Sequence, residues 1–205
     1  MTDRGAARGA RTKKPAPRNR PTVLGRIRRG LDAVAHPWRR RQALARLRTE
    51  AQPGVVLFVC HGNVCRSPFA EVVFRREING VSAGVLDTTS AGFIGPDRGS
   101  PPEAIAAAAR VGIDLTAHRS KMLSTELVRA SSLVVVMSAD QARAIRGRYA
   151  ATNPQVVILG DLDPMPISER TIVDPWKLPD EVFDASYARI HRCVRVLAEL
   201  MMASS

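Results

Sequence analysis

Three cysteines in 205 residues are too few, and too odd a number, for a disulfide scaffold, so we expect reduced thiols and a cytoplasmic protein. The sequence also lacks any apolar run of about 18 residues, which argues against a membrane-spanning helix. Its N-terminus has basic residues but no apolar stretch of the signal-peptide kind. Residues 1–50 contain no serine, which disfavours a transit peptide.

Acidic residues are scarce in one part of the chain only. Residues 1–50 carry 15 Lys and Arg against 3 Asp and Glu, whereas residues 51–205 carry 16 of each. The net charge of +12 therefore comes entirely from the N-terminal segment. Because a chain of this size can bury one ordinary core, we expect a basic N-terminal extension, residues 1–50, followed by a single domain, residues 51–205.

The extension divides into two parts. Residues 1–21 mix Gly, Pro, Ala and basic residues without an apolar period, which is typical of a disordered arm. From Val23 onward, apolar residues recur at helical spacing, which predicts a short basic amphipathic helix that Pro37 ends. The apolar positions are Leu24, Ile27, Leu31 and Val34.

The partner of this helix is left open by the pattern. The helix could pack on the domain or on a second copy of the chain, with its arginines in solvent. Alternatively, it could bind an acidic partner or an anionic lipid surface, which would make the protein peripheral to the membrane. Nucleic acid is a weaker candidate, because Trp38 is the only aromatic residue among the arginines.

After Pro53, short apolar runs alternate with helical patterns. Short apolar runs predict buried parallel strands at 54–59, 131–137 and 155–160, and the segment VLDTTS predicts a further strand at 85–90. Helices are predicted at 68–77, 101–112, 139–149 and 179–202. Ser67 is expected to cap the first of these helices, with Pro68 at its first position. The order predicts an α/β fold, a three-layer sandwich around a central four-stranded parallel sheet.

The segment CHGNVCRSP, residues 60–68, connects the first predicted strand to the first predicted helix. A turn in this place presents free backbone N–H groups and the positive end of the helix dipole, both of which favour an oxyanion. Gly62 permits close approach of the backbone, and the Arg66 guanidinium matches two phosphate oxygens. We therefore predict a phosphate-binding loop after the first strand.

Cys60 lies at the mouth of this predicted loop. The backbone amides, Arg66 and the helix end would favour its thiolate, and a thiolate facing a bound phosphate is suited to phosphoryl transfer through a phosphocysteine. A cysteine at a strand end can also be only a small buried apolar residue. Because Cys60 and Cys65 lack a second ligand pair at zinc spacing, we expect no metal and no cofactor. The two thiols could instead form a redox-sensitive pair.

The loop resembles the C-x-G-N-x-C-R-S-P signature of the low-molecular-weight protein tyrosine phosphatases. The resemblance extends from about Val55 to Met202 and includes the segments TSAGF, GIDLTAHRSKM, VVVMS and IVDPW in order. It implies hydrolysis of phosphotyrosine on proteins, with Cys60 as the nucleophile, Arg66 as the phosphate clamp and Asp174 as the general acid and base. It also implies a polar network that holds the loop in shape, formed by Asn63, Ser67, Ser90 and His118.

Substrate contacts follow from the loop and its rim. Trp176 stands where the family often has Tyr and is expected to stack on a phenyl ring, and His61 lies at a variable rim position. The substrate-binding residues expected from the resemblance are His61, Gly62, Asn63, Val64, Cys65, Ser67 and Trp176.

Three alternative functions share the loop or its fold. Phosphoarginine phosphatases are similar to this family but carry Thr where this chain has Val64, which favours phosphotyrosine. Arsenate reductases need a further redox cysteine pair, and only Cys193 remains. Intact Cys60, Arg66 and Asp174 disfavour a non-catalytic phosphoprotein-binding module. The resemblance also suggests an autophosphorylating tyrosine kinase of polysaccharide export as the protein substrate.

Overall fold

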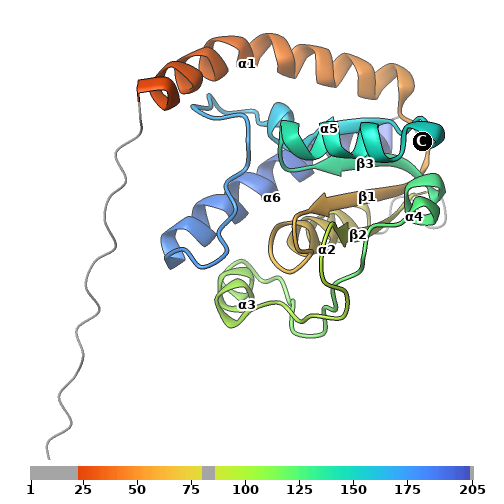
Figure 1. The fold of residues 1–205 in the computed structure, drawn as a ribbon, viewed down its shortest axis with the longest axis vertical. Helices are drawn as coiled ribbons and strands as arrows, with labels where there is room; N and C mark the ends of the chain where they lie inside the picture. The colour runs from red at the N-terminus through yellow and green to blue at the C-terminus, as the bar shows by residue number, and fades with distance from the viewer. Residues whose placement is uncertain (1–22, 80–85, 204–205) are drawn as a thin grey trace, which may run out of the picture.

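The computed structural model describes residues 23–79 and 86–203, and within them a parallel sheet forms the centre of the molecule (Figure 1). Its strand order is β2-β1-β3-β4, and every pairing is parallel. The predicted α/β sheet is therefore confirmed. The strands are β1 (Gly54–Cys60), β2 (Leu86–Gly92), β3 (Ser131–Val136) and β4 (Val156–Ile158).

Helices connect these strands, and the predicted ones are present with shifts of a few residues at their ends. A helix that the sequence did not predict, α4, has six residues, which is too short to show a helical period. The helices are α1 (Val23–Glu50), α2 (Arg66–Ile78), α3 (Pro102–Ala109), α4 (Thr125–Ala130), α5 (Ala139–Arg148) and α6 (Asp180–Ala203). Two short 3₁₀ helices are η1 (Ala150–Thr152) and η2 (Leu159–Leu162).

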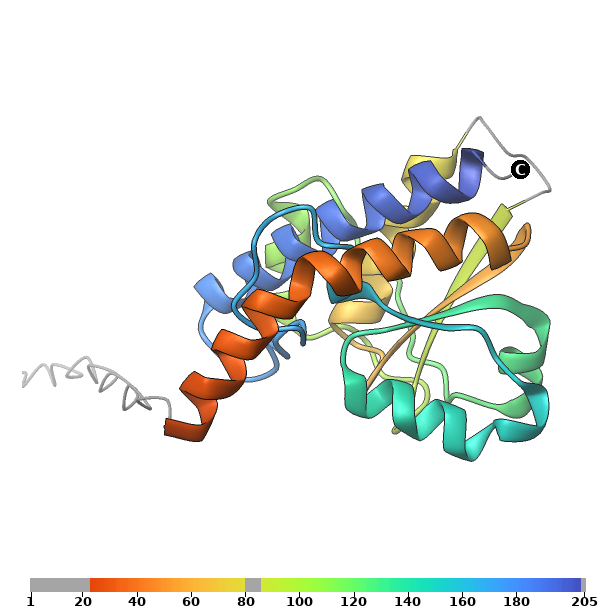
Figure 2. The same cartoon turned by 90° about the horizontal axis from the view of Figure 1, so that it is seen from above.

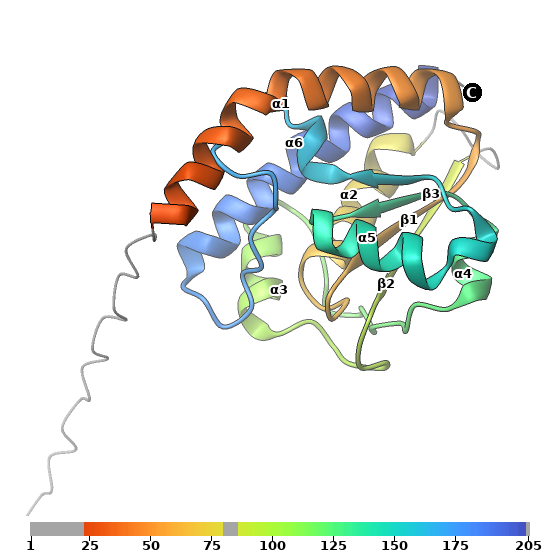
Figure 3. The same ribbon diagram turned by 45° about the horizontal axis from the view of Figure 1, so that its top comes forward.

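Side chains on β1 alternate between the two faces of the sheet, which creates two separate cores. Val56 and Phe58 belong to a large core that α2, α3 and α6 cover. Leu57 and Val59 belong to a smaller core on the opposite face, covered by α4 and α5. The sheet therefore lies between two helical layers, as the three-layer prediction requires (Figure 3).

The prediction that Pro37 ends the first helix is wrong, because α1 continues through Pro37 to Glu50. A proline in a helix removes one backbone hydrogen bond and bends the helix, and α1 is visibly curved (Figure 3). Contacts to the domain on both sides of the proline offset this loss. His36 contacts Asp163, and Leu47 is buried in the large core. Figure 2 shows α1 lying alongside α6, with which it is in contact.

In residues 31–38 of α1, the two sides of the helix are arranged opposite to the usual pattern of a surface helix. Leu31, Val34 and Trp38 are 64, 83 and 62% exposed, whereas Asp32 and His36 are buried against the domain. The side chains of Leu24 and Ile27, and the predicted disordered arm at 1–21, lie outside the described residues. Within the described ranges, no helix is both long and apolar enough to cross a membrane.

Candidate active site

Cys60 is the last residue of β1, and the loop of residues 60–65, called the phosphate loop below, leads directly into α2. Two donors converge on its sulfur: the Asn63 backbone N–H at 3.2 Å and the Ser67 hydroxyl at 3.1 Å. Cys60 is 3% exposed and lines a cavity. Its surroundings therefore supply hydrogen-bond donors to a negatively charged sulfur.

The prediction that Ser67 caps α2 is wrong. The helix begins at Arg66, its N-cap is Cys65, and that cap has no side-chain hydrogen bond. Ser67 lies inside the first turn, where its hydroxyl donates to the Cys60 sulfur and accepts from the Asn63 side-chain amide at 2.9 Å. A hydroxyl engaged with its neighbours in this way is not available to cap a backbone N–H, and Ser67 therefore contributes to the site instead.

Asn63 links the phosphate loop to the rest of the domain. Its backbone adopts a left-handed conformation, with φ of 51°, which asparagine tolerates better than most residues. Its side chain donates to Ser67 and to the Ser90 hydroxyl at 2.8 Å, and accepts from the Lys121 N–H at 2.7 Å. Its carbonyl accepts from His118 Nε2 at 2.7 Å. The four residues of the expected polar network, Asn63, Ser67, Ser90 and His118, thus lie together around the loop.

Burial lowers the pKa of His118, although its hydrogen bond to the Asn63 carbonyl opposes this shift. The imidazole is therefore neutral at neutral pH, with its proton on Nε2, where it donates to the loop. His118 consequently supports the loop without adding a positive charge to it.

Sequence reasoning missed two supports of this network. Ser90 donates to Glu71 at 2.6 Å, and Glu71 is a buried carboxylate on α2. The sequence signal that could have identified Glu71 is its position. It is an acidic residue four positions after Ser67 and three before Phe74, on the buried stripe of the predicted helix. Gly92 is the second support, since a Cβ there would lie 2.8 Å from the Asn63 nitrogen. Glycine at this position lets β2 approach the loop closely.

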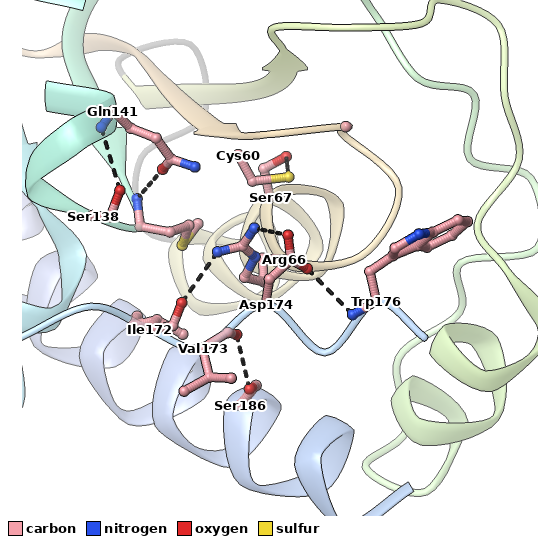
Figure 4. Close-up of polar contacts among 12 residues, drawn as sticks. Cys60, Arg66, Ser67, Ser138, Gln141, Ile172, Val173, Asp174, Trp176 and Ser186 are labelled. Carbon is pink, nitrogen blue, oxygen red and sulfur yellow. Dashed lines mark hydrogen bonds and ion pairs between the residues drawn. The ribbon is translucent and has the colours of Figure 1, made fainter. Parts of the chain in front are cut away.

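Arg66 and Asp174 are 108 residues apart in sequence and form an ion pair (Figure 4). The Arg66 guanidinium is buried and also donates to the Ile172 carbonyl at 3.1 Å. The Asp174 side chain is 42% exposed and accepts from the Trp176 N–H at 3.3 Å. The loop of residues 163–179, called the Asp174 loop below, thus brings a carboxylate to the guanidinium of the phosphate loop.

A cavity of about 110 Å³ lies over the phosphate loop. Two of its lining residues, Ile94 and Arg98, were not expected from the sequence. Arg98 donates to the Gly62 carbonyl at 2.7 Å and so ties the loop to the segment after β2. The cavity is lined by Cys60, His61, Gly62, Val64, Cys65, Ile94, Arg98, Asp174 and Trp176.

Cys65 shares this cavity with Cys60 but differs from it in environment. Burial, followed by the proximity of Cys60, raises the pKa of the Cys65 thiol to about 12, so it is protonated at neutral pH. Cys60, Cys65 and Cys193 are free thiols in the structure, and the redox pairing of Cys60 with Cys65 stays a prediction. In the described ranges, no three His, Cys, Asp or Glu side chains are grouped as metal ligands would be.

Residues 55–204 match the family model described as low molecular weight phosphotyrosine protein phosphatase. The chain belongs to this family. It is 36% identical over 141 residues to a probable low molecular weight protein-tyrosine-phosphatase, EpsP, from Ralstonia solanacearum, an alignment that covers 68% of this chain and 90% of the relative.

Solved structures of phosphatases share the fold. The tyrosine phosphatase Wzb from Escherichia coli K30, solved with sulphate, has a TM-score of 0.64 and 26% identity, covering 72% of this chain and 98% of that one. The arginine phosphatase YwlE from Geobacillus stearothermophilus has a TM-score of 0.62 and 26% identity, covering 72% and 92%. The family match begins at Val55, so α1 lies outside the part of the chain that defines this phosphatase family.

Proposed function

We propose that this phosphatase hydrolyses phosphotyrosine on proteins through a phosphocysteine on Cys60. The observation that carries the proposal is the meeting of three groups from the end of β1, the start of α2 and a distant loop. Cys60 and Asp174 line one small cavity, and Arg66 pairs with Asp174. A nucleophile, an anion clamp and a proton donor are the groups that this two-step reaction needs.

In the first step, the phosphoryl group binds above the phosphate loop and takes the place of Asp174 as a partner of the Arg66 guanidinium. The Cys60 thiolate attacks phosphorus, and the bond from phosphorus to the tyrosine oxygen breaks. Asp174, in its protonated form, donates a proton to the departing phenolate. The products of this step are a neutral tyrosine side chain and a phosphocysteine.

In the second step, Asp174 is a carboxylate and takes a proton from a water molecule that attacks the phosphocysteine. The bond between sulfur and phosphorus breaks, and inorganic phosphate leaves. The Ser67 hydroxyl, 3.1 Å from the Cys60 sulfur, and the Asn63 N–H stabilise the negative charge that returns to the sulfur. Both donors are already in place because the polar network holds them.

An arginine phosphatase is the second candidate, because YwlE shares the fold and a similar degree of identity with the tyrosine phosphatases. Val64 favours phosphotyrosine. Its side chain lines the cavity and lacks the hydroxyl expected of a phosphoarginine phosphatase. Trp176, which is 44% exposed and also lines the cavity, offers an apolar wall to a phenyl ring.

A comparison of phosphopeptides tests the choice of substrate. We expect kcat/KM for a phosphotyrosine peptide to exceed that for the matched phosphoarginine and phosphoserine peptides by at least about tenfold, because the apolar cavity rejects groups it cannot pair. Cys60→Ser protein controls for contaminating phosphatase. Val64→Thr should shift the ratio towards phosphoarginine. A wild-type preference for phosphoarginine would contradict the proposal and favour the second candidate.

We further propose that the protein substrate is an autophosphorylating tyrosine kinase. This part of the proposal depends on the family resemblance alone.

We also propose that residues 1–50 bring the enzyme to an anionic membrane surface, so that it is peripheral to the membrane. The exposed Leu31, Val34 and Trp38 support this, since they form an apolar stripe on a helix from the segment that carries the whole excess of positive charge.

Vesicle binding tests the proposed role of this stripe. The full chain should bind vesicles that contain phosphatidylglycerol, and bind more weakly as salt rises, because charges are screened within about 8 Å at physiological ionic strength. Replacing Leu31, Val34 and Trp38 together by Ser should reduce the binding. Val111→Ser, at an exposed apolar residue elsewhere, is the control. Concentration-dependent dimerisation that the triple variant abolishes would assign the stripe to a second copy instead.

A further inference from the structure

The inner face of α1 buries two polar side chains where apolar ones would stabilise a helix more simply. Asp32 is 8% exposed and His36 is 4% exposed, while Leu31 and Val34 on the outer face lie in solvent. A buried polar group costs free energy unless it is hydrogen-bonded, so its partners specify where the helix must lie. Each of these two side chains has a hydrogen-bond partner in the Asp174 loop.

His36 contacts the first residue of this loop, Asp163, and Asp32 contacts Arg170 in its middle. His36 Nε2 donates to the Asp163 carbonyl at 2.9 Å. The Asp32 carboxylate accepts from the Arg170 backbone N–H at 3.2 Å and from the Arg39 guanidinium at 2.7 Å. The contacts to Asp163 and Arg170 join residues more than 120 positions apart in the sequence, and they are made to the backbone of the loop, so they constrain its path.

The anchored segment is also held from α6. The Asp163 carboxylate is fully buried and accepts from Arg189 at 2.9 Å and from Arg192 at 2.7 Å. Burial opposes its ionisation, but the hydrogen bonds from Arg192 and the Met165 N–H hold its pKa below its usual value. Asp163 is therefore a charged, fixed point between α1 and α6.

From this fixed point, the contacts continue to the site. Arg189 donates to the Thr171 carbonyl at 3.0 Å. The next residue, Ile172, donates its N–H to the Met137 carbonyl at 3.0 Å and accepts from Arg66 at 3.1 Å. Asp174 follows two residues later. A continuous set of contacts thus connects α1, which lies outside the family match, to the carboxylate that pairs with Arg66.

We propose that α1 positions the Asp174 loop for catalysis, with Asp32 and His36 as positioning residues. This rests on the proposed function of Asp174 as the general acid. Without the side chains of Asp32 and His36, the first half of the Asp174 loop loses its hydrogen bonds to α1. The Asp174 carboxylate then samples positions away from the leaving oxygen of the substrate. A displacement of about 1 Å at a reacting group can cost about 10²-fold in rate.

The test uses the full chain with His36→Leu and, separately, Asp32→Ala. We expect kcat/KM for phenyl phosphate, a poor leaving group, to fall by about tenfold or more, since its departure needs a well-placed proton donor. For 4-nitrophenyl phosphate, a good leaving group, we expect a change within about threefold. His36→Gln keeps a donor at a similar reach and should recover most of the loss.

A second readout reports on the loop without depending on catalysis. In a Trp38→Phe background, Trp176 is the only tryptophan, and it lies two residues after Asp174. His36→Leu and Asp32→Ala should increase the quenching of Trp176 fluorescence by acrylamide. Tyr149→Phe is the matched control, because it removes another buried side-chain hydrogen bond to a backbone carbonyl, that of Leu123, in the core on the opposite face of the sheet.

The outcomes separate the two proposals. Equal losses on both substrates, or losses no larger than those of Tyr149→Phe, would overturn the positioning role of α1. If Asp174→Asn itself shows no dependence on the leaving group, the acid role of Asp174 fails, and Trp176 quenching alone then decides whether α1 holds the loop. If His36→Leu does not fold, Asp32→Ala, which breaks the separate contact to Arg170, decides the matter.

Discussion

Cys60→Ser will reduce the hydrolysis of aryl phosphates by at least about 10³-fold, because removing the nucleophile of a covalent mechanism removes the pathway and leaves only binding contributions. The substitution is nearly isosteric, and Ser67 and Asn63 can donate to a serine oxygen as they do to sulfur. The fold should therefore survive. Steady-state turnover of 4-nitrophenyl phosphate is the measurement, with thermal unfolding to check that the variant is native.

The control for this prediction is Cys193→Ser. Cys193 is fully buried in α6, away from the cavity, and burial raises the pKa of its thiol to about 12. The Cys193→Ser variant should retain most of the wild-type activity. The wild-type enzyme, quenched with acid during turnover, should carry phosphate on the peptide that contains Cys60. Turnover in Cys60→Ser comparable to wild type would rule out the covalent mechanism.

Asp174→Asn should lower kcat/KM for phenyl phosphate by about 10² to 10⁴-fold, the usual contribution of a positioned proton donor. For 4-nitrophenyl phosphate the loss should be much smaller, because a stable leaving group departs without protonation. The comparison uses kcat/KM since this quantity reports the formation of the phosphocysteine, the step in which the phenolate leaves.

Asp140→Asn is the control for the loss of an ion-paired carboxylate, since Asp140 pairs with Arg143 on the exposed surface of α5. This variant should change kcat/KM for either substrate by no more than about twofold, as expected for a surface pair. Equal losses on the two substrates in Asp174→Asn would count against Asp174 as the acid. They would instead assign it a role in holding Arg66, with which it pairs in the structure.

The two faces of α1 give this enzyme's extension two separate tasks in our proposals. The inner face, through Asp32 and His36, contacts the Asp174 loop, and the outer face exposes Leu31, Val34 and Trp38. Contact of the outer face with a membrane should leave the inner contacts intact, because the side chains of the outer face are exposed and those of the inner contacts are buried. The vesicle and leaving-group experiments therefore test independent properties.

Much of the catalytic domain follows from local patterns in the sequence. Continuous apolar runs determine β1, β3 and β4, because a strand buried on both faces needs apolar residues at every position. The phosphate loop is contiguous in sequence between Cys60 and Arg66, so its residue types alone indicate an anion site at a helix N-terminus. The distant carboxylate, Asp174, was expected only through the family resemblance.

Only the tertiary structure decided what lies around these elements. Sequence indicated a helix ending at Pro37, yet contacts to the Asp174 loop and the core carry α1 through it. It indicated a cap at Ser67, yet that hydroxyl bonds to Cys60 and Asn63. A sequence pattern reports period and turn chemistry over a few residues. The partner of a buried polar group, such as Asp163 for His36, is set by segments that meet only when the chain has folded.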